Sequence, residues 1–149
     1  MTTQTELRPP LENCTCLALR QAARHVTQFY DRHLAGVGLR VTQFSILAKL
    51  KRKGPMSINT LARDMVMDRT TLGRNILPLE RDGLVAVVPS TRDRRSKELQ
   101  LTEAGAARLR QAHRGWLDAQ AAFADAFGAQ RTVELRAVLN SVSAIDLED

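Results

Sequence analysis

Hydrogen-bonding side chains gather at the start of one predicted helix in the middle of the chain. Asp68 caps this helix, which is predicted to run from Arg69 to Asp82 and to end at Gly83. Its outward positions hold cationic, hydroxyl and amide side chains: Arg69, Thr70, Thr71, Arg74 and Asn75. Arginine can pair with guanine and asparagine with adenine, and threonine can contact a base edge or a thymine methyl group. The pattern therefore favours a helix that enters the major groove of DNA.

A second group of cations lies between two predicted strands, Leu84–Val88 and Lys97–Leu101. The polar loop Ser90–Ser96 joins them into a hairpin, and the charged residues at its tip are Arg92, Asp93, Arg94, Arg95 and Lys97. Such a cluster needs a counter-charge, which a narrow DNA minor groove supplies. The alternative is an ordinary solvated hairpin. We expect Asp93 to hold the Arg95 guanidinium in a bidentate pair and to aim it.

Three predicted helices must position these two groups from the N-terminal side. Apolar residues at three- and four-residue spacings predict a helix over Leu17–Leu34, ended by Gly36 and Gly38. A second helix is predicted to begin at Thr42 as its cap and to stop at Gly54-Pro55, with Phe44, Leu47 and Leu50 inward. A short third helix is capped by Ser57 and runs to about Met65. The third helix, the turn Val66-Met67 and the helix after Asp68 form a helix-turn-helix.

Two more helices follow the hairpin. Thr102 is predicted to cap a long helix that extends to Phe127. After Gly128, a final helix is predicted to bury five apolar side chains: Leu135, Val138, Leu139, Val142 and Ile145. In the helix predicted over Arg69–Asp82, Pro78 removes a backbone donor, so we expect a kink there. The fold class is therefore mainly α with a small β-hairpin wing.

Composition and charge restrict the class of protein. The chain has 149 residues and a net charge of +6, yet its last 34 residues hold two basic and six acidic ones. The basic excess thus lies in the first part of the chain and indicates a polyanionic partner. The polar first ten residues predict a disordered arm and no secretory signal, so we expect a cytoplasmic protein. His25, His33 and His113 are scattered and form no catalytic or metal motif, so we expect neither an enzyme nor a cofactor.

Four segments together resemble the MarR family of bacterial regulators: Asp68-Arg-Thr-Thr-Leu-Gly-Arg, Leu79-Glu-Arg-Asp-Gly-Leu-Val, Asp93-Arg-Arg-Ser-Lys and Leu101-Thr-Glu-Ala-Gly. The resemblance implies a winged helix-turn-helix over 42–101, within one domain covering 1–149. It implies that Arg95 enters the minor groove with Asp93 as its partner, and that a palindromic operator is released when a small molecule binds or a thiol is oxidised. Two features depart from the family pattern: Ala86-Val87, where arginine is frequent, and Pro78.

The terminal helices are expected to form a homodimer. A winged helix needs only about 60 residues, and the added segments 11–38 and 102–149 would each expose an apolar stripe in a monomer. The DNA contacts expected on this basis are Ser57, Arg69, Thr70, Thr71, Arg74, Asn75, Arg92, Arg94, Arg95 and Lys97. A sequence-independent architectural DNA-binding protein remains an alternative, and affinity that barely changes between sequences would distinguish it.

Two kinds of signal sensing remain open. A small aromatic or phenolic ligand could bind between the dimer helices and the winged module, near Tyr30, His33, Phe44 and Trp116. The alternative is that these residues belong to the hydrophobic core, as the few aromatic residues of a chain more often do. The segment Leu11–Leu19 resembles the first helix of the organic-hydroperoxide-sensing branch of the family, and Cys16 matches its reactive cysteine. Cys14 could then resolve the oxidised thiol. Arg20 stands where that branch has a tyrosine, and a buried, inert Cys16 is the competing interpretation.

Overall fold

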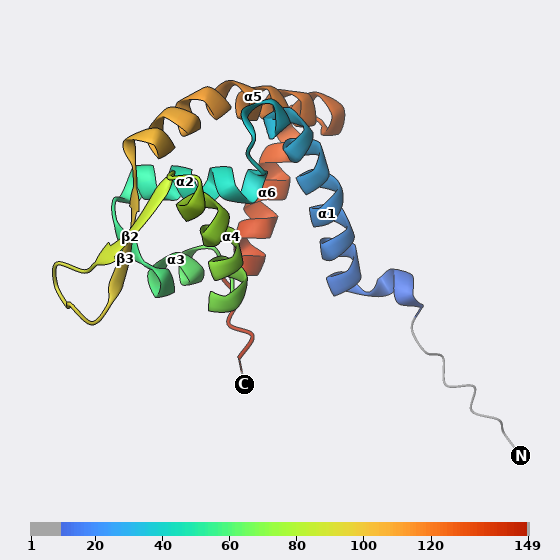
Figure 1. Ribbon diagram of the computed structural model, residues 1–149. Helices are drawn as coiled ribbons and strands as arrows, with labels where there is room; N and C mark the ends of the chain where they lie inside the picture. The colour runs from blue at the N-terminus through green and yellow to red at the C-terminus, as the bar shows by residue number, and fades with distance from the viewer. Residues whose placement is uncertain (1–9, 149) are drawn as a thin grey trace, which may run out of the picture.

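The computed structural model describes residues 10–148. Residues 1–9 lie outside the described part, and with them nearly all of the predicted N-terminal arm. The elements in chain order are η1 (Leu11–Asn13), α1 (Thr15–Leu34), η2 (Ala35–Val37), α2 (Val41–Lys53), β1 (Met56–Ser57), α3 (Ile58–Asp64), α4 (Arg69–Arg81), β2 (Val85–Pro89), β3 (Lys97–Leu101), α5 (Glu103–Phe127) and α6 (Ala129–Ser143). The predicted fold class, mainly helical with a β-hairpin wing, is confirmed (Figure 1).

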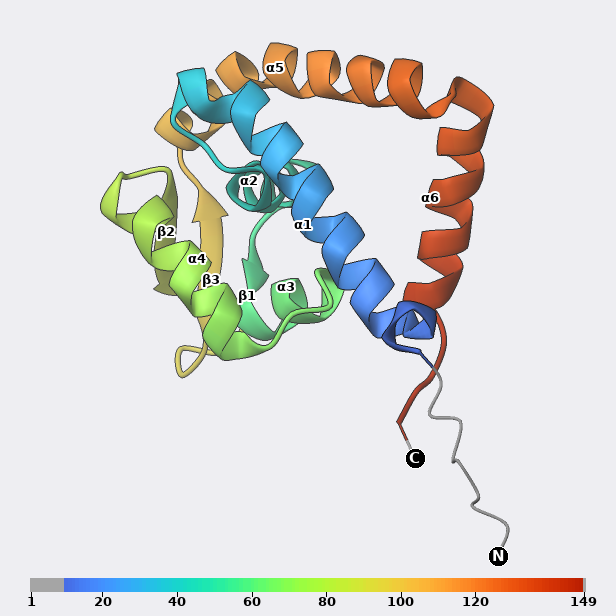
Figure 2. The ribbon, with the colours of Figure 1, turned by 90° about the vertical axis from the view of Figure 1, so that its right-hand side faces the viewer.

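Two regions make up the molecule. Helices α2, α3 and α4 and the small sheet form one module, and α5 passes over it as a long helix (Figure 1). Helix α1 lies beside the module in Figure 1, and α6 extends downward from the end of α5 beside the module in Figure 2. Helix α5 contacts both α1 and α2, so it joins the module to the terminal helices.

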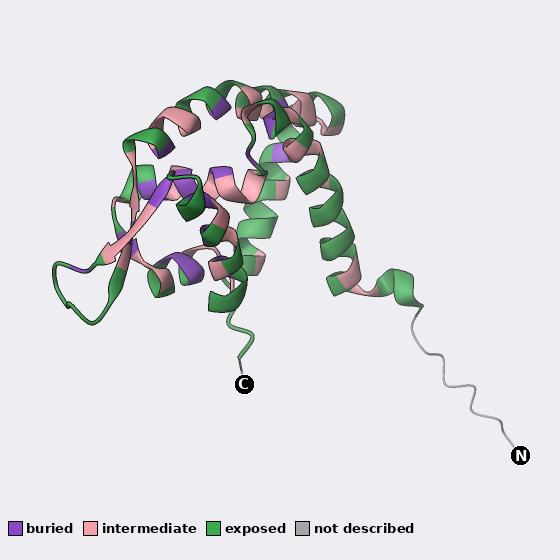
Figure 3. Cartoon of the chain, in the orientation of Figure 1, coloured by how far each residue is buried: buried purple, intermediate pink, exposed green. Residues whose placement is uncertain are grey.

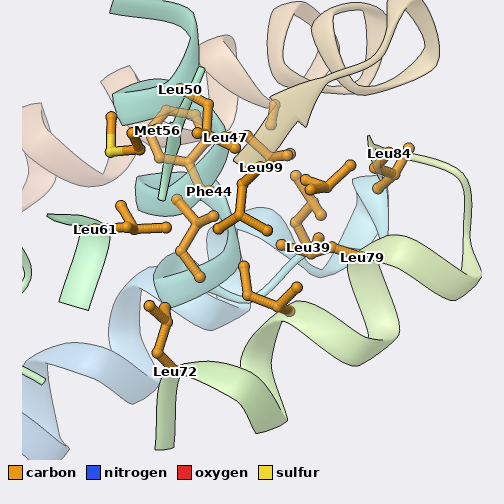
Figure 4. Packing of buried hydrophobic residues seen from close by; sticks show 14 of the residues in the cluster. Leu39, Phe44, Leu47, Leu50, Met56, Leu61, Leu72, Leu79, Leu84 and Leu99 are labelled. Atoms are coloured by element: carbon orange, nitrogen blue, oxygen red, sulfur yellow. The ribbon is translucent and has the colours of Figure 1, made fainter. Parts of the chain in front are cut away.

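The core lies where the apolar faces of α2, α3 and α4 meet the sheet. Leu47, Leu61, Leu72 and Leu99, one from each of these elements, are fully buried (Figure 4). Burying a leucine side chain stabilises a fold by about 1.5–3 kcal/mol, so these contacts fix how α4 sits on the module. The positions predicted as inward on α2, namely Phe44, Leu47 and Leu50, are all buried.

Three of the four predicted helix caps are confirmed. The side chains of Ser57, Asp68 and Thr102 accept hydrogen bonds from the backbone N–H groups of Thr60, Thr71 and Gly105 respectively. The predicted cap at Thr42 is wrong. Helix α2 begins at Val41 because the Asp31 carboxylate, from α1, accepts from the Val41 N–H at 2.8 Å, and the Gln43 side chain accepts from the Arg40 N–H at 3.0 Å.

The sheet has one strand more than the predicted hairpin. Its order is β1-β3-β2, all antiparallel, with Val85 opposite Leu101 and Met56 opposite Leu99. The two-residue strand β1 has no alternating pattern of its own, and it forms because the Gly54-Pro55 turn brings Met56 to the edge of β3. Strand β2 begins one residue later than predicted and includes Pro89. Helix α4 continues through Pro78, and the predicted kink stays a prediction.

Helix α6 differs from its prediction. Within one chain its apolar side chains are not buried, and most of α6 is coloured as exposed in Figure 3. Val138 and Leu139 are exposed, Leu135 and Val142 are half-buried, and Ile145 lies beyond the helix end and is exposed. The reason is that α6 packs on α5 alone among the elements with substantial contacts. One face of the helix is therefore left without a covering element in the single chain.

Candidate nucleic-acid interface

The turn between α3 and α4 has an unusual backbone. Val66 has φ 51°, the one positive φ at a non-glycine residue in the described chain, and its side chain is exposed. A β-branched residue in this region is strained. The turn is nevertheless fixed, because the Met67 N–H donates to the Ala62 carbonyl at 2.9 Å and Leu61 and Leu72 anchor the two helices in the core. The strain is the cost of turning sharply into α4.

The start of α4 divides its polar residues into two groups. The Asp68 carboxylate accepts from both the Thr71 N–H, at 2.8 Å, and the Thr71 hydroxyl, at 2.7 Å, and these bonds lower the pKa of Asp68. The Asn75 amide donates to the Thr71 carbonyl at 2.9 Å. Thr71 and Asn75 are thus engaged within the helix.

The other predicted residues of α4 are Arg69, Thr70 and Arg74. Their side chains are exposed and make no hydrogen bond or ion pair to any residue of 10–148. Two guanidinium groups and one hydroxyl therefore project from the first two turns of α4, and they are available to a ligand.

Backbone hydrogen bonds shape the tip of the hairpin, here called the wing tip (Thr91–Lys97). The Asp93 carboxylate accepts from the Arg95 backbone N–H at 3.0 Å, and the Asp93 carbonyl accepts from the Ser96 N–H at 3.1 Å. No ion pair between Asp93 and the Arg95 guanidinium occurs among residues 10–148, so the predicted bidentate pair is wrong in this structure. A carboxylate two residues before an N–H closes a tight turn more readily than it reaches back to a long side chain.

Ser90, which was not predicted, holds the base of the wing tip. It is buried, its hydroxyl donates to Glu98 at 3.0 Å, and the same oxygen accepts from the Arg92 N–H at 3.2 Å. All seven residues of the wing tip are exposed, including Arg92, Arg94, Arg95 and Lys97. The cations therefore sit on a braced turn and project into solvent.

An ion-pair bridge fixes α3 against α2 and was also missed. Asp64 of α3 lies 2.9 Å from the Lys49 ammonium and 2.8 Å from that of Lys53, and these bonds lower the pKa of Asp64. Lys49 and Lys53 are one helical turn apart, so they could have been recognised as one cationic face, but nothing local to Asp64 marks its partner. At the start of α3, the Ser57 hydroxyl donates to the Thr60 hydroxyl and accepts from the Thr60 N–H.

The two cationic groups lie on one edge of the module. In Figures 1 and 2, the start of α4, helix α3 and the wing tip all lie at the lower edge, away from α5. A helix start with projecting arginines and a basic loop beside it can contact two neighbouring grooves of one duplex.

The cysteines lie at the start of α1. Cys14 has an extended backbone and its Sγ accepts from the Leu17 N–H at 3.4 Å, so it caps the helix. Cys16 lies in the first turn, and its side chain is exposed. Both thiols are free, and Cys16 is not buried in the single chain, contrary to the competing interpretation.

The four aromatic and histidine residues predicted to line a ligand pocket do not meet at one cavity. The rings of Phe44 and Trp116 stack with centroids 5.6 Å apart and join the core, and the His33 ring bonds to the Phe29 carbonyl of its own helix. Tyr30 alone lines the main cavity, where its hydroxyl donates to Gln120. Burial raises the pKa of Tyr30, and the nearby Arg136 charge partly opposes this.

That cavity is an open groove of about 680 Å³ between α1, α5 and α6, here called the terminal-helix groove. Its lining is mostly apolar and includes Leu19, Val26, Phe123, Leu135 and Leu139. Its polar side chains include Tyr30, Gln120 and Arg136. Among residues 10–148 no cluster of three potential metal ligands occurs, and no helix there is long and apolar enough to span a membrane.

Comparisons with known proteins agree on one family. Residues 39–97 match the model of the MarR family. The transcriptional activatory protein BadR of Rhodopseudomonas palustris is 37% identical over 98 residues, which are 64% of this chain and 56% of BadR. The chain thus spans little more than half the length of that curated relative.

Two solved structures are similar over most of their length. The M. tuberculosis transcriptional regulator MosR, in complex with DNA, has 35% sequence identity and a TM-score of 0.75, and the alignment covers 88% of this chain and 97% of MosR. The transcriptional repressor CouR, bound to a 23-mer DNA duplex, has 25% identity and a TM-score of 0.80, with 89% and 94% covered.

Proposed function

Since the chain belongs to the MarR family of winged-helix transcription regulators, we propose that it is a sequence-specific DNA-binding repressor. It binds a pseudo-palindromic operator as a homodimer and leaves it when a small aromatic or phenolic ligand binds. The observation that carries this proposal is the single edge on which the start of α4 and the wing tip project five arginines and a lysine, all exposed: Arg69, Arg74, Arg92, Arg94, Arg95 and Lys97.

The two groups have different roles in this proposal. Helix α4 enters the major groove, where Arg74 and Thr70 contact base edges. The wing tip lies along the adjacent minor groove, where Arg95 enters and the other cations neutralise phosphates. Thr71, Asn75 and Ser57 hold α4 and α3 in position in this proposal, because each side chain already makes a hydrogen bond within its own helix start.

Two arginine variants test the division of roles. We expect Arg74→Ala to lose about 1–3 kcal/mol of binding on the preferred operator and to relax the preference at one base pair of each half-site. We expect Arg95→Ala to weaken binding to every duplex and to reduce the salt dependence. Fluorescence anisotropy with preferred and scrambled duplexes, at several salt concentrations, measures both effects.

The control for this experiment is Arg110→Ala, which removes an exposed arginine of α5 far from the proposed DNA-binding edge. Its affinity should equal that of the parent. If Arg95→Ala bound operator as tightly as the parent at all salt concentrations, the role of the wing would be wrong.

A second copy of the chain is proposed to cover the terminal-helix groove. Val138 is 59% exposed and Ile145 is 56% exposed, and both belong to the apolar side left open on and after α6. A two-fold dimer buries the same face of both copies at once. It would also close the open side of the groove into a cavity whose polar groups include Tyr30, Gln120 and Arg136. An aromatic acid fits such a cavity, with its carboxylate on Arg136.

Thiol sensing is the second candidate, favoured by the exposure of Cys16 and by the position of Cys14 just outside the helix. A Cys16 thiolate would attack the peroxide oxygen of an organic hydroperoxide, giving a sulfenic acid and an alcohol. Cys14 would then attack the sulfenic sulfur, forming a disulfide and releasing water. Because Cys14 is extended and Cys16 helical, a disulfide within one chain requires the first turn of α1 to unwind.

We expect organic hydroperoxide to reduce operator affinity in the parent at least tenfold and to leave Cys16→Ser unaffected, if thiols are the sensor. In Cys14→Ser, oxidation of Cys16 should stop at the sulfenic acid. Mass spectrometry after trapping with dimedone detects this species. Equal operator binding by the parent before and after treatment would eliminate thiol sensing and leave the small-molecule ligand as the signal.

A further inference from the structure

Gly73 lies in the middle of α4, where the protein itself does not require a glycine. A Cβ at Gly73 would meet nothing within 4 Å outside its own helix, and the φ of Gly73 is not in the positive range. The two glycines of α5 are different: a Cβ at Gly105 would collide with the Leu84 carbonyl oxygen, and one at Gly115 would lie 2.5 Å from that of His33. Glycine is the poorest helix former after proline. Packing and backbone conformation within the described chain therefore do not account for this glycine.

Gly73 shares one face of α4 with an exposed leucine. Thr70, Gly73, Arg74 and Leu77 are spaced i, i+3, i+4, i+7 and form one stripe along the helix. Leu72, Ile76 and Leu79, on the other side, are buried in the core. Leu77 is 64% exposed, so a large apolar side chain stands in solvent one turn beyond Arg74.

We propose that Gly73 and Leu77 form an apolar reading site for the 5-methyl group of a thymine in the major groove. This inference rests on the proposed function. The methyl group of thymine is the apolar group that a base pair presents in the major groove. The missing Cβ at Gly73 lets the helix backbone approach the base edge, and Leu77 supplies the apolar surface.

The charges around the site favour DNA as its occupant. Arg74 shares the stripe, Arg69 begins the helix, and neither forms an ion pair within residues 10–148. An apolar protein partner would have to leave both guanidinium groups unpaired at the contact, whereas DNA pairs them with phosphates or guanine.

Gly73→Ala separates this role from a structural one, because the two expected effects have opposite signs. Alanine fits the open space and favours the helix, so the Tm should rise by about 2–4 °C. Operator affinity should fall at least about tenfold. Gly36→Ala is the matched control: its Cβ also meets nothing within 4 Å at a φ outside the positive range, but it lies in η2. It should leave operator affinity unchanged. A lower Tm for Gly73→Ala, or unchanged affinity, would overturn the proposal.

Uracil substitution identifies the base. Replacing each operator thymine by uracil in turn should weaken the parent about fourfold at one position of each half-site, the effect of one buried methyl group. Leu77→Ala should show no such difference at that position, and thymines outside the half-sites should be insensitive in both proteins. If Arg74→Ala loses affinity while Gly73→Ala and Leu77→Ala match the parent, this inference alone fails. If the parent shows no sequence preference, the proposed function fails.

Discussion

The dimer should bind one pseudo-palindromic operator at least about 10³-fold more tightly than a random duplex of the same length, with half-site centres about one helical turn apart. The reason is the pair of α4 stripes, each reading several base pairs through groups that project from the protein. If the protein bound DNA through the cations of the wing tip alone, contacts to phosphates would supply its affinity, and it would show little preference among sequences. Selection from a randomised duplex library, followed by anisotropy at fixed salt, measures the ratio.

The spacing between half-sites provides the control for this experiment. Inserting five base pairs between them turns one half-site to the opposite side of the duplex, and binding should fall to the level of a single half-site. If all selected sequences bound within a few-fold of random duplex, the protein would be an architectural DNA-binding protein instead of a regulator.

Leu139→Asp should convert the dimer to a folded monomer and reduce operator affinity by about 10²–10⁴-fold. Leu139 lines the terminal-helix groove and is 39% exposed in the single chain, so an aspartate there is solvated in the monomer. In the proposed dimer the aspartate would be desolvated, at a cost that exceeds the gain from pairing with Arg136. The loss of affinity follows because the second half-site no longer binds as part of one molecule. Light scattering gives the mass and anisotropy the affinity.

Leu117→Asp is the matched control for the dimer variant. Leu117 is 44% exposed on α5, does not line the terminal-helix groove, and lies in sequence between Arg114 and Asp118, which form an ion pair. It should remain dimeric and bind operator like the parent. A dimeric Leu139→Asp protein, with unchanged circular dichroism and operator affinity, would contradict the proposed interface.

Sequence signals that act within a few residues predicted the fold well. Ser57, Asp68 and Thr102 each cap the N–H three residues further on, so their roles could be read from the sequence. The start of α2 was predicted at the wrong residue, because one of the two side chains that cap it, Asp31, comes from another helix. Strand β1 escaped prediction for the same reason: its two residues have a partner only after β3 has been placed.

The same distinction, between signals local in sequence and contacts between distant residues, holds for the candidate site. Cationic residues of α4 and the wing tip could be identified because exposed arginines near a helix start or hairpin tip need no partner to be recognised. The ion pairs that fix α3 against α2, between Asp64 and the two lysines Lys49 and Lys53, could not be identified in this way, because they join residues distant in sequence. The prediction of an aromatic ligand pocket was wrong because Phe44 of α2 and Trp116 of α5 stack on each other in the core. Aromatic residues alone do not indicate whether their neighbours are ligand or protein.

Helix α5 has a mechanical consequence. It is one continuous helix of 25 residues, about 37 Å long, and it starts one residue after the wing strand β3. A tilt of about 5° at the end that meets α6 displaces the other end by about 3 Å, close to the rise of one base pair. The wing and α4 move with that end, because the Thr102 hydroxyl donates to the Gly83 carbonyl. A rigid helix of this length would act as a lever: a small rotation between the terminal helices would shift the wing and α4 by about the rise of one base pair.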